Sequence, residues 1–215
     1  MAKFGSDSKF GTGKDANDGV SKKVSEFLNQ YDEIIVEGQT EADILQGVLG
    51  IKRDKIKDAG GRKNVFTKIR KLCYSGPEGR VLAITDGENE GIYVIANKLK
   101  SVGCNDVEVD PPLVRVNGGK IDIWVMGLPE KCYEGCTESV MGRILEIEKK
   151  GLNVDGDCKN DKKALWDYVC GVGSCSNEGF RNILINDNKE KIGGELLDYI
   201  TRSGKFVYNP HDCKG

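Results

Sequence analysis

Two short segments of the chain combine an apolar run with carboxylates, and their residues are the best suited to do chemistry. The first is residues 33–36 followed by Glu37, and the second is residues 81–85 followed by Asp86 and Glu88. When two such runs are strands of an open α/β sheet, their carboxyl ends line the crevice where ligands bind. Carboxylate oxygens at that edge suit Mg²⁺, which assists phosphate chemistry. The two segments therefore predict an acidic metal site.

Neighbouring residues add to this prediction. Gly38 follows Glu37 and lets the backbone turn tightly and approach a ligand closely, because glycine has no Cβ. Glu90 is either a third metal ligand or a cap of the helix that follows it. For Glu37 and Asp86, the alternative is a purely structural role as a helix cap or a helix-terminal charge. Their placement at corresponding strand ends favours the metal site.

A basic segment lies between the two acidic ones. It contains Arg62, Lys63, Lys68, Arg70 and Lys71. On a helix that begins after Gly61, these cations can follow a phosphate backbone, whereas a solvated helix face is the alternative. The residues expected to contact the substrate are Gly38, Gly61, Arg62, Lys63 and Lys68.

Alternating apolar runs and amphipathic stretches predict the elements that position these residues. Strands are expected at 33–36, 55–58, 81–85 and 121–126, and helices at 20–30, 39–49, 64–73, 90–102 and 139–150. Thr40 is the expected N-cap of the second helix, with Asp43 as its capping-box partner. Strands that alternate with helices predict parallel pairing and right-handed crossovers, and hence the α/β class.

The chain divides into three expected parts. Residues 1–19 are rich in Gly, Ser, Asp and Lys without periodicity, which is typical of a flexible arm. Residues 20–150 form the α/β domain. Residues 151–215 form a small helical extension packed on the same core, with helices expected at 162–169, 179–184 and 194–202.

Composition limits the class of protein and its partners. The chain has 215 residues, of which 38% are hydrophobic and 31% charged, and its formal net charge is −2. Without an overall basic field, nucleic acid would have to bind through a local patch. No apolar run approaches the roughly 20 residues that span a bilayer, and the N-terminus lacks the apolar core of a signal peptide. We therefore expect a cytoplasmic protein with no membrane partner.

The eight cysteines leave three interpretations open. A zinc site would use Cys132, Cys136, Cys170 and Cys175, although structural zinc sites usually space paired cysteines more closely. The second is disulfide bonding, which occurs inside hyperthermophiles, and the third is buried free thiols. The single histidine, His211, lies in a polar C-terminal stretch, which disfavours a mechanism with a histidine base.

The two acidic segments resemble the Toprim domain of topoisomerases, bacterial-type primases, overcoming-lysogenization-defect nucleases and the small nucleases that mature ribosomal RNA. The matching residues are 36–41 and 84–91, and the further cues are 59–65, 121–126, Gly135 and Glu138. The likeness covers roughly residues 31–148 and is greatest to small stand-alone Toprim-like proteins of unknown function. It implies a Rossmann-like fold with a mainly parallel sheet flanked by helices.

The resemblance also implies an activity. It assigns proton transfer to Glu37, and it assigns Mg²⁺, with Mn²⁺ as a second candidate, to Asp86 and Glu88. Glu88 stands where the family has aspartate, so its arm is longer, and Glu130 is the candidate for a fourth acid. The implied reaction is cleavage or transfer at a phosphodiester of DNA or RNA.

Two other functions compete with a nuclease. The first is a non-catalytic Toprim-like module that binds nucleic acid and protein, which Glu88 favours and Glu37 opposes. The second is a subunit of a defence or repair complex, because similar domains often occur beside an ABC-type ATPase. This chain contains no ATPase motif of its own.

Overall fold

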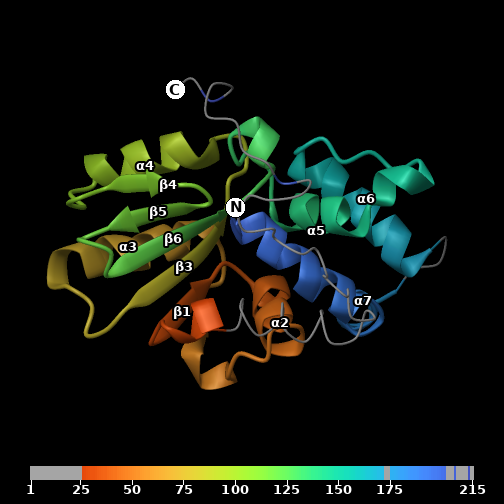
Figure 1. Cartoon of the computed structure of the whole chain (residues 1–215), viewed down its shortest axis with the longest axis horizontal. Helices are drawn as coiled ribbons and strands as arrows, with labels where there is room; N and C mark the ends of the chain where they lie inside the picture. Colours follow the sequence, from red (N-terminus) through yellow and green to blue (C-terminus); the bar gives the residue numbers. More distant parts are fainter. Residues whose placement is uncertain (1–25, 172–174, 202–205, 207–212, 214–215) are drawn as a thin grey trace, which may run out of the picture.

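A six-stranded sheet forms the centre of the protein (Figure 1). The computed structural model describes residues 26–171, 175–201, 206 and 213. The strand order is β2-β1-β3-β6-β5-β4. The strands are β1 (Glu33–Val36), β2 (Ile56–Asp58), β3 (Val81–Asp86), β4 (Glu108–Asp110), β5 (Leu113–Val116) and β6 (Ile121–Met126).

The four strands expected from the sequence are the parallel part of this sheet. β2, β1, β3 and β6 pair in parallel, and β3 pairs with β6 along its whole length. β1, β3 and β6 are buried almost throughout, including all six residues of β6, whereas the edge strand β2 buries only Ile56. Continuous burial is typical of parallel strands covered on both faces. The fold is therefore of the α/β, Rossmann-like class, as expected.

The sequence pattern does not predict two of the six strands. β4 and β5 form an antiparallel extension, in which β5 pairs with β6 and β4 lies at the edge. β4 has only three residues, and none of them is buried. A short, partly charged edge strand shows no hydrophobic pattern of its own, because its pairing partner decides its conformation.

The helices fall into two groups. Their bounds are α2 (Gln39–Gly47), α3 (Arg62–Ser75), α4 (Gly91–Ser101), α5 (Thr137–Leu145), α6 (Cys158–Cys170) and α7 (Asn177–Thr201), with short 3₁₀ turns at η1 (Arg53–Lys55), η2 (Pro129–Lys131) and η3 (Ile147–Lys150). α7 packs against α2, α5 and α6. α3 and α4 lie away from α7 (Figure 1), and residues of both line one cleft. Of the helix expected at 20–30, residues 26–30 are described; residues 26–29 are helical and Gln30 lies in a turn.

The C-terminal part differs from its expected form, because one long helix replaces two short ones. α7 continues through Gly193 and Gly194, which the sequence pattern treats as a break. Each glycine costs a helix interior about 1 kcal/mol relative to alanine. Leu184, Ile192 and Leu196 are buried in the common core, and this packing stabilises the helix across the glycines. No helix in the described ranges is long and apolar enough to cross a membrane.

The start of α2 also differs from its expected form. The N-cap is Gly38 rather than Thr40, and the reciprocal contact comes from Glu41 rather than Asp43. The Glu41 carboxylate accepts a hydrogen bond of 3.0 Å from the backbone N–H of Gly38. The helix therefore begins directly at the end of β1, which carries Glu41 toward the strand ends.

Six of the eight cysteines are disulfide-bonded. The pairs are Cys73–Cys104, Cys132–Cys213 and Cys170–Cys175. Cys136 and Cys158 carry free thiols. The proposed zinc quartet does not form, because Cys132 is bonded to Cys213 and Cys170 to Cys175. His211 lies outside the described residues.

Candidate functional site

The two acidic strand ends meet at the carboxyl edge of the sheet. β1 and β3 are parallel neighbours, with Ile35 opposite Ala83. Glu37 Oε2 accepts hydrogen bonds from the Thr85 hydroxyl at 3.1 Å and from the backbone N–H of Asp86 at 3.3 Å. The strand register thus brings Glu37 beside Asp86, as the sequence pattern predicts.

Asp86 is held by the first turn of α5. Its Oδ1 accepts hydrogen bonds from the backbone N–H of Thr137 at 2.8 Å and from the Thr137 hydroxyl at 3.1 Å. The N-terminus of a helix has free N–H groups and favours negative charge. The two hydrogen bonds to Oδ1 therefore fix the orientation of the carboxylate.

A candidate metal group adjoins this contact. Among the described residues, the ligand atoms of Asp86, Cys136 and Glu138 all lie within 4.8 Å of one another. Cys136 is the N-cap of α5 and Glu138 lies in its first turn. Carboxylate oxygens are ligands of hard cations, whereas the thiol of Cys136 favours a softer metal such as zinc. The group is thus chemically able to hold a divalent cation.

Further carboxylates complete what we call the acidic cluster, defined as Glu37, Glu41, Asp86 and Glu138. Burial raises the pKa of Asp86 well above its ordinary value, and the negative charge of Glu41, Cys136 and Glu37 raises it further. Burial likewise raises the pKa of Glu41, to which Glu138 and Glu37 contribute. Burial also raises the pKa of Glu37, although hydrogen bonds from Asp86 and Thr85 oppose this effect. A bound cation would relieve the repulsion among these carboxylates. The convergence of the carboxylates is therefore the best evidence that the residues fit a cation.

Glu88 and Glu90 have other partners. Arg62 bridges them, with Nη1 2.7 Å from Glu88 and Nη2 3.0 Å from Glu90, and Lys98 also pairs with Glu90. Burial of Glu90 raises its pKa, but hydrogen bonds from Lys98 and Arg62 outweigh this and lower it overall. Both carboxylates therefore face cations, and their assignment as metal ligands stays a prediction.

The turn that carries these acids is tightly packed. A Cβ atom on Gly87 would lie only 1.7 Å from the carbonyl oxygen of Tyr133, so glycine is required there. On either side, the Glu88 N–H donates to the Gly135 carbonyl at 2.6 Å, and the Gly135 N–H donates back at 2.7 Å. This bridge fixes Asp86 relative to the segment that leads into α5.

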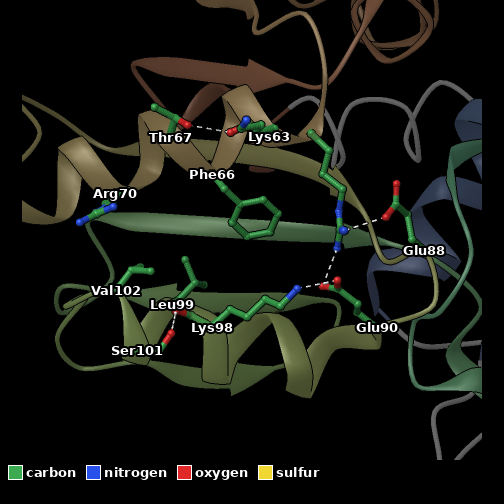
Figure 2. Close-up of a pocket in the computed structure, with 11 residues that line it drawn as sticks. Lys63, Phe66, Thr67, Arg70, Glu88, Glu90, Lys98, Leu99, Ser101 and Val102 are labelled. Atoms are coloured by element: carbon green, nitrogen blue, oxygen red, sulfur yellow. Dashed lines mark hydrogen bonds and ion pairs between the residues drawn. The ribbon is translucent and has the colours of Figure 1, made fainter.

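The predicted substrate-contacting residues are partly assembled. The N–H of Gly61 donates to the carbonyl of Glu37 at 2.7 Å, which brings the start of α3 to the acidic edge. Arg62 and Lys63 line a cleft of about 560 Å³ between α3 and α4 (Figure 2). Lys68 is not among the lining residues. Glu130 pairs with Arg143 at 2.7 Å and lies outside the candidate metal group.

Sequence reasoning missed part of the site. Glu41 and Glu138 entered only as parts of a family resemblance, Cys136 entered only as a candidate zinc ligand with other cysteines, and Thr137 had no assigned role. The feature of the sequence that could have indicated these residues is the polar run at 135–139, where helix α5 begins. Such a run at a helix N-terminus suits an anion or a metal-bound carboxylate, but its neighbours cannot be identified from the sequence.

No protein-family model matches the chain, and no curated protein and no solved structure match it. The Toprim resemblance therefore stays a prediction. The functional argument depends on the geometry of the acidic cluster and of the adjoining cleft.

Proposed function

We propose that the protein is a Mg²⁺-dependent nuclease, or a nucleotidyl or phosphoryl transferase, that acts on phosphodiesters of nucleic acid. One observation carries this proposal: four half-buried carboxylates converge at the carboxyl edge of the sheet, next to a helix N-terminus. Carboxyl groups whose pKa is shifted by burial and by neighbouring charges gather at functional sites, which supports a bound cation or a reaction here. The resemblance of residues 36–41 and 84–91 to the Toprim domain gives further support.

Asp86 and Glu138 are the proposed metal ligands, with Glu41 close to them. A bound Mg²⁺ or Mn²⁺ would polarise the phosphoryl oxygens and stabilise the leaving oxygen. Thr137 orients Asp86 through two hydrogen bonds, so the ligand is positioned before the metal arrives. Glu88 and Glu90 could join only by leaving Arg62, and they are therefore secondary candidates.

Glu37 is the proposed acid–base residue. Its pKa is raised by burial, which moves it toward neutral pH, where a general acid or base is most effective. Its hydrogen bonds to Thr85 and to the backbone of Asp86 fix its position beside the proposed metal ligands. Arg62, at the junction with the cleft, would contact a phosphate oxygen.

A non-catalytic binding module is the second candidate, and the pairing of Glu88 and Glu90 with cations favours it. In that case, the positions that resemble the metal ligands of the Toprim family serve as ion-pair partners that order α3 against α4. An ABC-type ATPase partner stays a prediction, because no feature of the acidic cluster bears on it.

A cleavage assay separates these functions. Labelled single- and double-stranded DNA and RNA are incubated with Mg²⁺, Mn²⁺ or EDTA. We expect metal-dependent cleavage that is lost in Asp86→Asn and falls about 10²- to 10⁴-fold in Glu37→Gln, the usual contribution of a general acid or base. Glu108→Gln, which removes an exposed carboxylate from the edge strand, is the matched control and should cleave normally. An absence of cleavage on every substrate, with binding unchanged in both variants, would favour the binding module.

A further inference from the structure

Apart from Arg62, the residues that line the cleft between α3 and α4 have no role in the chemistry proposed above. Its volume of about 560 Å³ lies within the usual range of small-ligand sites. We propose that this cleft holds one unpaired nucleotide of a single-stranded nucleic acid, next to the phosphodiester at the acidic cluster. The inference rests on the proposed function, since it assigns the substrate class of the same site.

The floor of the cleft is apolar and includes an aromatic ring. Phe66 is only partly buried, and its side chain extends from α3 toward Leu99 and Lys98 of α4 (Figure 2). Leu99 and Val102 complete the apolar surface. An aromatic ring open to a cleft is a stacking platform for any base, since every base has a π-face.

The rim of the cleft is basic. Four cations line it, namely Arg62, Lys63, Arg70 and Lys98, against the two carboxylates Glu88 and Glu90. The difference of four minus two leaves two positive charges, although the whole chain has a net charge of −2. The charge is thus locally complementary to a phosphate backbone.

The exposed face of α3 extends this pattern beyond the cleft. Lys63, Phe66, Arg70 and Tyr74 follow one another at helical spacing, so they share one face of the helix. Tyr74 is 66% exposed, and the Arg70 guanidinium carbon lies 5.9 Å from its ring centroid. Alternating cations and aromatic rings are typical of surfaces that bind single strands.

The inner end of the cleft meets the acidic cluster at Arg62. Its Nε donates to the carbonyl of Asp86 at 3.2 Å, and its guanidinium carbon lies 5.3 Å from the Phe66 ring centroid. One residue thus contacts both the proposed metal-binding strand end and the stacking platform. A strand that follows the cleft would bring its backbone to Asp86.

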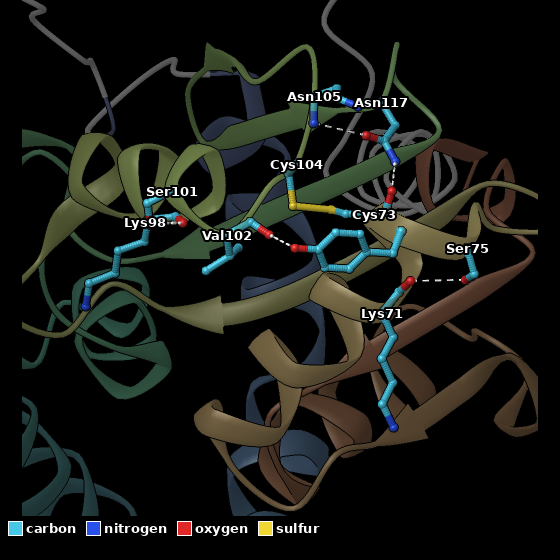
Figure 3. Close-up of a disulfide and its surroundings, with 10 residues drawn as sticks. Lys71, Cys73, Ser75, Lys98, Ser101, Val102, Cys104, Asn105 and Asn117 are labelled. Atoms are coloured by element: carbon cyan, nitrogen blue, oxygen red, sulfur yellow. Dashed lines mark hydrogen bonds between the residues drawn. A yellow bond between two sulfur atoms is a disulfide. The ribbon is translucent and has the colours of Figure 1, made fainter.

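Covalent and hydrogen-bonded contacts fix the width of the cleft. The Cys73–Cys104 disulfide joins the last turn of α3 to the segment after α4 (Figure 3). The Tyr74 hydroxyl donates to the carbonyl of Val102 at 3.0 Å. A cleft held in this way needs little ordering on binding, which favours affinity. Duplex bases cannot reach its floor, because they are stacked and paired.

Fluorescence anisotropy in EDTA tests the inference without cleavage. The probes are a labelled single-stranded DNA, the same RNA sequence and the matching DNA duplex. We expect both single strands to bind more tightly than the duplex, and Phe66→Ala to weaken their binding about 5- to 150-fold, as the loss of one base–aromatic stack does. Arg70→Ala should reduce the slope of log affinity against log salt by about 0.7. Lys100→Ala, an equal loss of charge on α4 outside the cleft, is the matched control.

Two further variants keep the result interpretable. Phe66→Leu keeps an apolar side chain but no ring, so weakened binding with an unchanged melting temperature identifies stacking, and Phe66→Trp should restore affinity. Equal binding of duplex and single strand, or wild-type affinity in Phe66→Ala, overturns the inference. Binding of a mononucleotide without binding of a strand overturns it as well.

Failure of the nucleotide site can be distinguished from failure of the proposed nuclease function. Asp86→Asn is expected to bind single strands in EDTA at least as tightly as the wild type, while it loses cleavage. Cleavage that does not depend on Phe66 would leave the nuclease in place and reject the nucleotide site. Binding that depends on Phe66, without cleavage of any substrate, would support the nucleotide site and reject the nuclease.

Discussion

Asp86 illustrates how one residue serves two opposed requirements. Its carboxylate accepts two hydrogen bonds from Thr137, which stabilise its position. It is also half-buried beside Glu41 and Glu37, and the loss of solvent together with their negative charge makes its charged form unfavourable. Without a cation, a charged Asp86 should therefore destabilise the fold, whereas with a cation it should become a source of binding energy.

The pH dependence of stability follows from this conflict. The pKa of Asp86 is raised on folding, so the folded state binds more protons above the ordinary carboxyl pKa. Its contribution to the free energy of unfolding therefore falls as pH rises, until the raised pKa is passed. In EDTA, Asp86→Asn should melt at least about 2–4 °C above the wild type at neutral pH, with a smaller gap near pH 5. Mg²⁺ or Mn²⁺ should raise the melting temperature of the wild type only. A variant that melts below the wild type in EDTA at both pH values would contradict this account.

The turn after Asp86 has no room for a side chain at position 87, where the sequence has glycine. Alanine there would place its Cβ 1.7 Å from the carbonyl oxygen of Tyr133, so the bridge to Gly135 must move. We expect Gly87→Ala to lower the free energy of unfolding by about 1–3 kcal/mol or more, measured by urea titration. Gly193→Ala makes the same change inside α7 with only an ordinary 3.6 Å contact to Val48, and it should stabilise by about 0.5–1 kcal/mol. Equal effects of the two substitutions would refute the steric explanation.

At the scale of elements, α7 is attached to the sheet through Tyr199. The buried hydroxyl lies 3.0 Å from the carbonyl of Val125 and 2.9 Å from that of Gly127, and it accepts from the Gly127 N–H at 3.0 Å. Its ring contacts Trp124, Tyr133 and Phe206. The helix thus satisfies the backbone where β6 ends, close to the acidic edge.

Removal of this hydroxyl should be costly. In Tyr199→Phe the backbone groups of Gly127 lose their buried partner, so we expect the free energy of unfolding to fall by about 1–3 kcal/mol. Chemical denaturation followed by circular dichroism measures the change. Tyr168→Phe, at a half-buried site on α6, should stay within about 0.5 kcal/mol of the wild type. A Tyr199→Phe protein as stable as this control would show that α7 is held by apolar packing alone.

At the scale of the whole molecule, two of the three disulfides join segments that are distant in the sequence. One of them links Cys132, in the loop beside the acidic cluster, to Cys213 near the end of the chain. Another closes the α3–α4 cleft through Cys73 and Cys104. Closure of such loops restricts the unfolded chain and is commonly worth about 2–4 kcal/mol per bond.

Counting the free thiols tests whether these three disulfides are present. Alkylation of the unfolded, unreduced chain should label two cysteines, Cys136 and Cys158, and prior reduction should raise the number to eight. In the folded protein, Cys158 should react first, because Cys136 is buried. Peptide mass spectrometry assigns the labels. A label on Cys73 or Cys104 before reduction would contradict the disulfide at the cleft.

The sequence by itself determined the parallel strands and where their carboxylates would meet. Apolar runs that end in acids are local signals, and parallel pairing then brings Glu37 and Asp86 to one edge regardless of the details of the loops. The α/β class followed for the same reason. β4, β5 and the continuity of α7 did not follow, because these elements depend on packing and pairing rather than on a pattern of their own.

Only the tertiary structure decided which partner each acid has. Glu88 and Glu90 follow Asp86 by two and four residues, yet Arg62 at the start of α3 forms ion pairs with both of them. Glu138 instead reaches Asp86 from the start of α5, far along the chain. Partner choice depends on backbone register, on turns such as the one at Gly87 and on competition among nearby charges. These are long-range quantities, and no local pattern of residues encodes them.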